Sequence, residues 1–408
     1  MTGGRNPASV ADLIDEREVI DLLQDLVRIP SPYFEEGEIT RFVFDWLDDH
    51  GLDPSLHPVS EPEMTGFEGE NVIATLPGTD PDAPTVLLNG HMDTVKIVDD
   101  WDGDPFSARI SDGKLFGQGA CDMKGGLASL LVAFKALAEM EEAMRGGVVL
   151  TAVVDEEGPY GLGTDALIRD GLLDECDMAI VAEPGPVLAT DAVDNPVLIL
   201  GARGRFLYDI EVRGRAAHGS QPDAGTNAVV DGSRLVEALS NMAVGNHPRL
   251  GSGSVCPLRI EGGSETLSVP VECRLLVDRH VVMGEDAESV RSDARAIVDS
   301  LDLDSSVDVG FRPVPEPEMR YGPYLTDPDS PLVGSLRTAA ADVVGADPAI
   351  SYFASVGDFN YLGHRADLPV VILGPGGGNV HAAGEFVYTD EVVDIARIVA
   401  SGTASLVS

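Results

Sequence analysis

Hydrophobic positions in the first 202 residues follow two patterns, one with helical spacing and one of short continuous runs. Helices are predicted near residues 16–28 and 36–50 and over GGLASLLVAFKALAEM, whose large apolar residues recur every three or four positions. Short apolar runs that predict strands are NVIATLPG, TVLLNGHMD, GVVLTAVVDEE and MAIVAEP. Strands that alternate with helices in this way indicate an α/β fold, with a mixed, mostly parallel sheet covered by helices.

The pattern changes at about residue 203 to the order β-α-β-β-α-β. The predicted elements are the strand FLYDIEV, a helix from Asn227 to about Asn241, the strands SVCPLRIE and LSVPVECRLLVD, a helix near 285–301 and the strand SVDVGF. This order is typical of a ferredoxin-like domain. The larger pattern then resumes with a helix near 331–344 and the strand LPVVILGPG.

The small domain is therefore predicted to be inserted into the large one. The predicted boundaries are residues 1–202 for the first part of the large domain, 203–316 for the insert and 317–408 for the second part. A chain of 408 residues also exceeds what one core usually supports. The segment PVPEPEM at 313–319 is the hinge candidate, because proline favours extended connections.

Charge and cysteine content exclude several classes of function. The chain carries 69 acidic against 27 basic residues, a formal net charge of −42, which would repel nucleic acid and anionic membranes. Its four cysteines form no CxxC pair and indicate reduced thiols. The N-terminal segment lacks an apolar run long enough for a signal peptide or a membrane span, so we expect a cytoplasmic protein.

The excess of acidic residues also predicts halophilic behaviour. Repulsion among these charges destabilises the folded state in dilute buffer, and salt at about 1 M shortens the Debye length to about 3 Å. We therefore expect the melting temperature to rise steeply between about 0.1 M and about 3 M KCl. Thermal unfolding followed by circular dichroism measures this, and unchanged melting across the series would contradict it.

Histidine and carboxylate side chains occur where predicted strands end or, in one case, in a glycine-rich loop before a helix. In open α/β sheets, ligands bind outside the carboxyl ends of the strands, so these segments can converge. Imidazole and oxygen ligands without thiolates fit catalytic zinc, with cobalt or manganese as alternatives. Two such ions can share a bridging hydroxide, and a carboxylate that stays off the metals can act as the general base. The candidate residues are His91, Asp93, Asp122, Glu156, Glu157, Glu183 and His381.

One motif suggests a different class of protein. The segment GLGTDA at 161–166 formally matches the dinucleotide fingerprint G-x-G-x-x-A. However, DEEGPY separates it from its strand, and the nearby acidic residues would repel a pyrophosphate. A nucleotide-binding function is therefore not supported.

Six motifs occur in order along the chain: HMD, GACDMKGG, DEEGPYGLGT, AEP, AAHGSQPDAGTNA and VHAAGE. Through them the chain resembles the family of acetylornithine deacetylase, succinyl-diaminopimelate desuccinylase and carboxypeptidase G, over essentially its whole length. The resemblance implies a homodimeric hydrolase with two divalent metal ions, zinc favoured, that cleaves the amide bond of an N-acyl amino acid. It also implies that the insert is a lid and dimerisation domain. A dipeptidase or carboxypeptidase acting on short peptides, and a non-catalytic metal-binding homologue, remain as alternatives.

The same resemblance implies a role for each candidate. Asp122 would bridge the metals, Glu156 would be the general base, and Asp93 would accept a hydrogen bond from the second ring nitrogen of His91. One metal site would be completed by His91 and Glu183, and the other by Glu157 and His381.

The resemblance also suggests roles for three residues of the insert. His218 in RAAHGS would donate to the oxyanion, often from the partner subunit, and the alternative is a surface histidine. Arg279 would bind the substrate carboxylate, and the alternative is a salt bridge to Asp278 or Glu285. Leu267 in TLSVP stands where many relatives have Asn, which removes a substrate contact expected for acetylornithine or succinyl-diaminopimelate.

Overall fold

The computed structural model describes residues 10–140, 144–191, 194–263, 265–316 and 320–408. The chain divides into two compact units. Unit 1 consists of Met1–Ala202 and Leu325–Ser408, and unit 2 is Arg203–Tyr324. Residues 317–319 of the hinge candidate lie outside the described residues.

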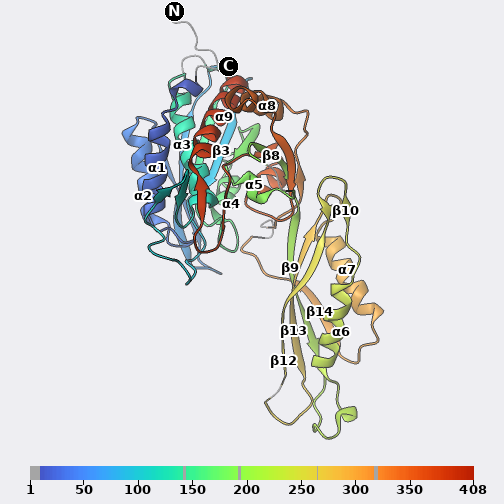
Figure 1. Cartoon of the computed structure of the whole chain (residues 1–408). Coiled ribbons are helices and arrows are strands. Elements are labelled where there is room, and N and C mark those ends of the chain that lie inside the picture. The colour runs from blue at the N-terminus through green and yellow to red at the C-terminus, as the bar shows by residue number, and fades with distance from the viewer. Residues whose placement is uncertain (1–9, 141–143, 192–193, 264, 317–319) are drawn as a thin grey trace, which may run out of the picture. The chain divides into compact units, whose positions relative to one another are not determined.

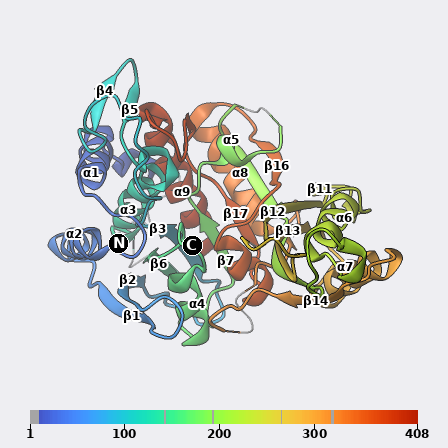
Figure 2. The same ribbon diagram turned by 90° about the horizontal axis from the view of Figure 1, so that it is seen from below.

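A mixed nine-stranded sheet forms the centre of unit 1 (Figure 2). Its strands are, in sheet order, β1 (Ser55–Glu61), β2 (Phe67–Leu76), β6 (Val148–Val153), β3 (Val86–His91), β7 (Met178–Val181), β17 (Val370–Ile372), β8 (Val197–Ala202) and β15 (Tyr324–Leu325), with β16 (Ala349–Phe353) paired to β8. Neighbours from β6 to β17 are parallel, whereas β1 and β2 are antiparallel. Every residue of β3 and β7 is buried, as expected for central parallel strands covered on both faces. The predicted α/β sheet is confirmed.

Helices cover this sheet, and α3 is the most deeply buried of them (Figure 1). It packs against α1, α9 and β3, which explains why its apolar residues are not confined to one stripe. The helices of unit 1 are α1 (Glu16–Arg28), α2 (Gly37–Asp49), α3 (Gly125–Ala138), α4 (Leu162–Arg169), α5 (Gly185–Leu188), α8 (Pro331–Val344) and α9 (Thr389–Val407). Short helical turns occur at Ala11–Leu13, Ala120–Lys124, Pro222–Ala224 and Tyr361–Arg365.

A small antiparallel sheet brings two distant parts of the sequence together. Its order is β18 (Gly377–Gly378), β19 (Phe386–Tyr388), β5 (Lys114–Phe116) and β4 (Arg109–Ser111). The pairing of β19 with β5 places the segment that follows His381 beside the segment that leads to Asp122. None of these short strands was predicted from the sequence.

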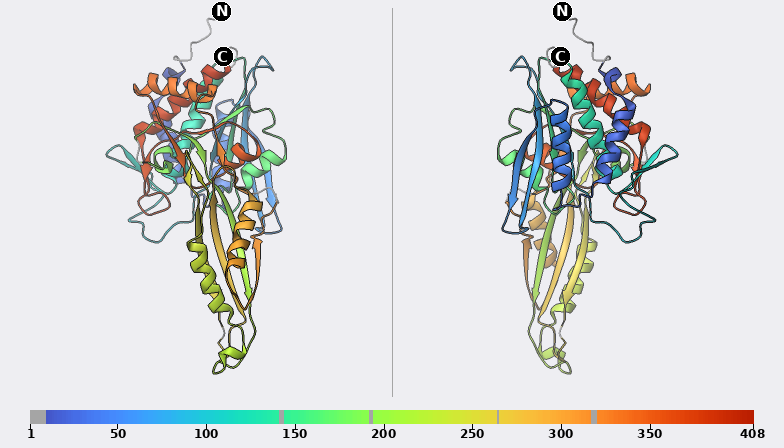
Figure 3. Two further views of the ribbon diagram at one scale, coloured as in Figure 1. Left: turned by 90° about the vertical axis from the view of Figure 1, so that its right-hand side faces the viewer. Right: turned by 90° about the vertical axis from the view of Figure 1, so that its left-hand side faces the viewer.

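Unit 2 is a four-stranded antiparallel sheet with two helices on one face (Figure 3). Its elements are β9 (Gly204–Arg213), α6 (Ala228–Ser240), β12 (Ser254–Gly262), β13 (Glu272–Val281), α7 (Ala287–Ser300) and β14 (Ser306–Phe311), with the short pair β10 (Asn246–His247) and β11 (Gly251–Ser252). Alternate residues of β9, from Phe206 to Val212, pack with Leu235 of α6 and Val290 of α7 in one core. The sheet order β12-β13-β9-β14 confirms the predicted ferredoxin-like fold.

Two further features of the structure are the state of the cysteines and the hydropathy of the helices. All four cysteines are free; Cys121, Cys176 and Cys273 are buried, and Cys256 is exposed. Among the described residues, no helix combines the length and the hydropathy that a membrane span requires.

Candidate metal centre

Four of the predicted site residues follow three adjacent parallel strands. His91 ends β3, Glu156 and Glu157 follow β6, and Glu183 follows β7. Because the carboxyl ends of parallel strands meet at one edge of the sheet, these side chains converge there. Asp122 reaches the same place from the turn before α3, and His381 from the segment before β19.

The His91 ring lies among the carboxylates. Its Nε2 atom is 3.2 Å from Asp122 Oδ1, 3.4 Å from Glu183 Oε1 and 3.9 Å from Glu156 Oε2. Burial lowers the pKa of His91, but Glu183, Asp122 and Asp93 together raise it well above its ordinary value. A concentration of negative charge therefore surrounds a single buried imidazole.

The second histidine faces the other side of the same aspartate. His381 Nε2 is 2.8 Å from Glu157 Oε1 and 3.4 Å from Asp122 Oδ2. The two oxygens of Asp122 thus face different imidazoles, Oδ1 toward His91 and Oδ2 toward His381. A carboxylate so placed can provide one oxygen to each of two cations.

The donor set fits divalent cations. Two overlapping groups, His91 with Asp122 and Glu157 and His91 with Glu156 and Glu183, each bring their ligand atoms within 4.8 Å of one another. Burial and then the negative charge of Asp122 raise the pKa of Glu183 to about 8 and that of Glu157 to about 7. In the described part of the chain, the ion-pair partners of these carboxylates are histidines alone. No lysine or arginine is among these partners, and imidazole and carboxylate ligands of this kind suit zinc, cobalt or manganese.

Glu156 is anchored differently from its neighbour Glu157. Its Oε1 accepts a hydrogen bond from the main-chain N–H of Asp358 at 3.1 Å, whereas no histidine lies closer to its Oε2 than His91, at 3.9 Å. Burial, with the charges of Glu183 and Asp358, raises the pKa of Glu156 well above its ordinary value, against the lowering effect of His91. Oε1 of this carboxylate is thus bound to the main chain, whereas Oε2 lies within ion-pair distance of His91.

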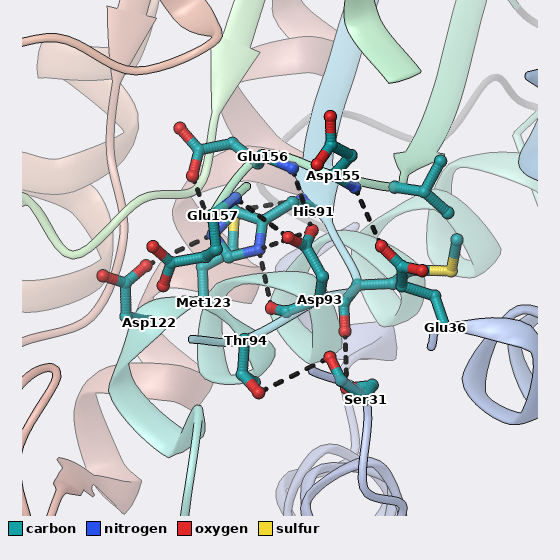
Figure 4. Close-up of polar contacts among 12 residues, drawn as sticks. Ser31, Glu36, His91, Asp93, Thr94, Asp122, Met123, Asp155, Glu156 and Glu157 are labelled. Carbon is teal, nitrogen blue, oxygen red and sulfur yellow. Dashed lines mark hydrogen bonds and ion pairs between the residues drawn. The ribbon is translucent and has the colours of Figure 1, made fainter. Parts of the chain in front are cut away.

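Asp93 contacts His91 through both its main chain and its side chain. His91 Nδ1 donates to the main-chain oxygen of Asp93 at 2.9 Å, and the Asp93 carboxylate is 3.5 Å away. That carboxylate also accepts the main-chain N–H groups of Glu156 at 3.1 Å and Glu157 at 2.9 Å (Figure 4). Asp93 therefore faces His91 Nδ1 with its main-chain oxygen and its carboxylate, and the carboxylate also holds the loop that carries Glu156 and Glu157.

Two buried carboxylates at the site had no predicted role. Glu36 accepts the main-chain N–H of Asp155 at 3.1 Å (Figure 4). Glu385 accepts main-chain N–H groups from the turn that contains Asp122. Glu385 ends the motif VHAAGE, so the motif was a signal for it, whereas no pattern around Glu36 distinguishes it from the many surface acids of this chain.

His218 lies in unit 2, on an exposed segment. Its Nδ1 is 2.8 Å from Ser220 Oγ and accepts the main-chain N–H of Ser220 at 3.2 Å. A neutral ring with Nδ1 as acceptor carries its proton on Nε2 and can donate from there. The main-chain oxygen of Leu267 accepts from Gly219 N at 2.8 Å, and the Leu267 side chain is 87% exposed.

Arg279, which was predicted to bind the substrate carboxylate, is buried in unit 2. Arg279 is only 1% exposed and forms an ion pair with Glu285. Its Nη1 also donates to the main-chain oxygen of His280 at 2.8 Å. The guanidinium is therefore engaged inside unit 2, as in the salt-bridge alternative, because β13 directs it toward the segment that begins α7.

The edge of the parallel strands, together with the loops of Asp122 and His381, gathers two histidines and several carboxylates, a donor set typical of metal-dependent hydrolases. Residues 87–402 match the family described as Peptidase family M20/M25/M40. The chain belongs to this family, and it is a hydrolase that acts on amides or peptides.

Individual relatives show how broad the family is. A succinyl-diaminopimelate desuccinylase from Nitrosomonas europaea is 29% identical over 82% of this chain and 86% of its own length. An N-formyl-4-amino-5-aminomethyl-2-methylpyrimidine deformylase from Bacillus subtilis is 28% identical over 94% of this chain and 93% of its own length. The crystal structure of aminopeptidase PepT from Bacillus cereus has the same fold, with a TM-score of 0.78 at 20% identity, over 97% of this chain and 100% of that chain.

Proposed function

We propose that this protein hydrolyses the amide bond of an N-acyl amino acid and holds two divalent cations, zinc favoured, at the candidate metal centre. The observation that carries the proposal is the position of Asp122, whose two oxygens face His91 and His381 separately. Glu183 beside His91 and Glu157 beside His381 would complete the two sites. When bound, the cations would supply Lewis acidity and lower the pKa of a water molecule.

Glu156 is the residue that moves the proton in this proposal. Asp358 N–H holds Oε1, so Oε2 is available to take a proton from the attacking water and to deliver it to the leaving nitrogen. Asp93 keeps this loop in position through the main chain of Glu156 and Glu157. The retained base and the full ligand set argue against a non-catalytic homologue.

The names of the sequence relatives favour a deacylase over a peptidase. The desuccinylase and the deformylase both remove an acyl group from nitrogen, and they cover most of this chain at 28–29% identity. The peptidase structure is only 20% identical and therefore supports the fold alone. A dipeptidase or carboxypeptidase remains the second candidate.

The test is release of free amine from matched panels of N-formyl, N-acetyl and N-succinyl amino acids and of dipeptides, at high salt with zinc or cobalt. We expect release from one N-acyl class that stops when a chelator is added and returns when metal is restored. Release from dipeptides alone would select the second candidate. If folded protein with two bound metals released no amine from any panel, both the deacylase and the peptidase candidates would be contradicted.

We further propose a homodimer formed through unit 2. Strand β12 lies at an edge of its sheet and exposes Leu258 at 54% and Ile260 at 49%. An edge strand with exposed apolar residues is a ready surface for pairing with a second copy. In such a dimer His218 would donate to the oxyanion of the partner's substrate, in agreement with its Nε2-protonated ring.

Mixing two inactive variants tests whether His218 acts in the partner's site. Neither His218→Ala nor Glu156→Ala homodimers should turn over substrate, because each lacks one group at every site. Subunit exchange should restore part of the activity, since a mixed dimer then contains one site with Glu156 from one chain and His218 from the other. Activity that stays absent after exchange, with mixed dimers demonstrated by mass spectrometry, would place His218 in its own subunit's site, whereas an active His218→Ala homodimer would place it outside catalysis.

A further inference from the structure

Glu385 is a buried carboxylate with an unusual set of partners. It is 1% exposed and lies between β18 and β19. Its Oε2 accepts from Gly119 N at 2.8 Å, and its Oε1 accepts from Cys121 N at 2.9 Å and from Asp122 N at 3.0 Å. Both oxygens are therefore used on one short turn.

The main chain around Glu385 also contacts the segment that leads to the turn of Asp122. Gly117 N donates to Glu385 O at 3.0 Å, and Phe386 pairs with Phe116 in the small sheet. Gly119 has a φ of 72°, a conformation that favours glycine, so the turn bends back toward the carboxylate. The segment of His381 and the segment of Asp122 are thus joined through Glu385.

An apolar or amide residue would fill this position at less electrostatic cost. At 1% exposure the carboxylate is removed from water, where its charge would be better stabilised. It also lies near Asp122, whose negative charge opposes its own. A buried carboxylate beside another carboxylate is costly unless its hydrogen bonds are needed.

We propose that Glu385 is the positioning residue for the bridging carboxylate: by binding the N–H groups of Gly119, Cys121 and Asp122, it fixes the turn so that Asp122 faces both His91 and His381. This inference rests on the proposed role of Asp122 in holding two cations. Glu385 itself contacts neither substrate nor metal in this account.

The chain provides a matched control for a purely structural role. Glu61 is also buried, at 8% exposure, and it accepts main-chain N–H groups from Glu63 at 3.0 Å, Met64 at 3.1 Å and Thr65 at 2.6 Å. It holds the turn between β1 and β2, which contains none of the predicted ligands. Loss of the carboxylate at Glu61 therefore reports the effect of weakening such a turn alone.

The experiment compares Glu385→Gln, Glu385→Asp and Glu61→Gln without substrate. Glutamine keeps the shape but replaces one acceptor oxygen with an NH₂ group that faces N–H donors, and aspartate keeps the charge but is one methylene too short. We expect both Glu385 variants to bind Co²⁺ about 10- to 100-fold more weakly and to change its visible absorption spectrum. Glu61→Gln should lower the melting temperature yet keep the wild-type Co²⁺ affinity and spectrum.

Wild-type Co²⁺ affinity and spectrum in Glu385→Gln would overturn the proposal. Failure of both Glu385 variants to fold in the presence of metal, while Glu61→Gln folds, would overturn it too, in favour of a purely structural role. Because these measurements need no turnover, they are independent of the substrate panels. A wild-type protein that binds two ions but cleaves no tested amide would contradict the proposed function and leave the Glu385 result standing.

Discussion

Glu156→Ala is expected to lose catalysis while the protein keeps its two metal ions. General acid–base catalysis by a positioned side chain is typically worth about 10² to 10⁴ in rate, so kcat should fall by at least that range. The metal content should persist because the five proposed ligands are untouched, and Glu156 Oε1 is bound to the Asp358 main chain. The measurement is kcat on the substrate found in the panels, together with metal content by mass spectrometry.

The adjacent residue provides the control for this prediction. Glu157 lies 2.8 Å from His381 Nε2 and is a proposed ligand, so Glu157→Ala should lose metal as well as rate. The contrast between two neighbouring glutamates separates proton transfer from metal binding. Normal turnover in Glu156→Ala, or loss of both metals from it, would contradict the assignment.

Asp122→Ala is expected to lose both metals and all measurable turnover. Removing a carboxylate that faces both histidines takes a ligand from each cation at once. The loss of affinity should therefore exceed the roughly 10- to 100-fold effect of residues that only support a ligand. Equilibrium dialysis against Zn²⁺ or Co²⁺ measures it directly.

Asp122→Asn distinguishes the loss of one cation from the loss of both. The amide keeps one oxygen acceptor and the same shape, so it can still bind one cation but presents an NH₂ group to the other. We expect this variant to retain close to one metal per chain. Two metals retained in Asp122→Ala would show that Asp122 bridges nothing.

The main elements of the fold could be predicted because their hydrophobic patterns are strong. The helix predicted near residues 285–301 is observed as α7 (Ala287–Ser300), and the order of unit 2 follows from its alternating strands. Helix α9 was not predicted, although the partly exposed Glu391, Asp394 and Arg397 recur every three residues among its buried apolar ones. The strands of the small sheet contain only two or three residues, which is too few to show a period.

The candidate site could be predicted only as far as side-chain chemistry and strand ends allow. His91, Glu157 and Glu183 are found together because the sheet edge brings them there. The partners of Asp93 and Glu385 are main-chain N–H groups, which every residue carries and which sequence therefore cannot distinguish. For Arg279 the sequence allowed two partners, and only the path of the chain after β13 shows that Glu285 is the partner.

The order of the strands in unit 1 also has a consequence for biosynthesis. Strand β17 lies between β7 and β8, although it is made only after the whole of unit 2, and α9 packs against α3 at the very end of the chain. A nascent chain that ends at residue 324 therefore has a complete ferredoxin-like unit but a large sheet that lacks an interior strand. Because His381 and Glu385 also belong to this later segment, the proposed metal centre can assemble only after residues 381–385 have been synthesised.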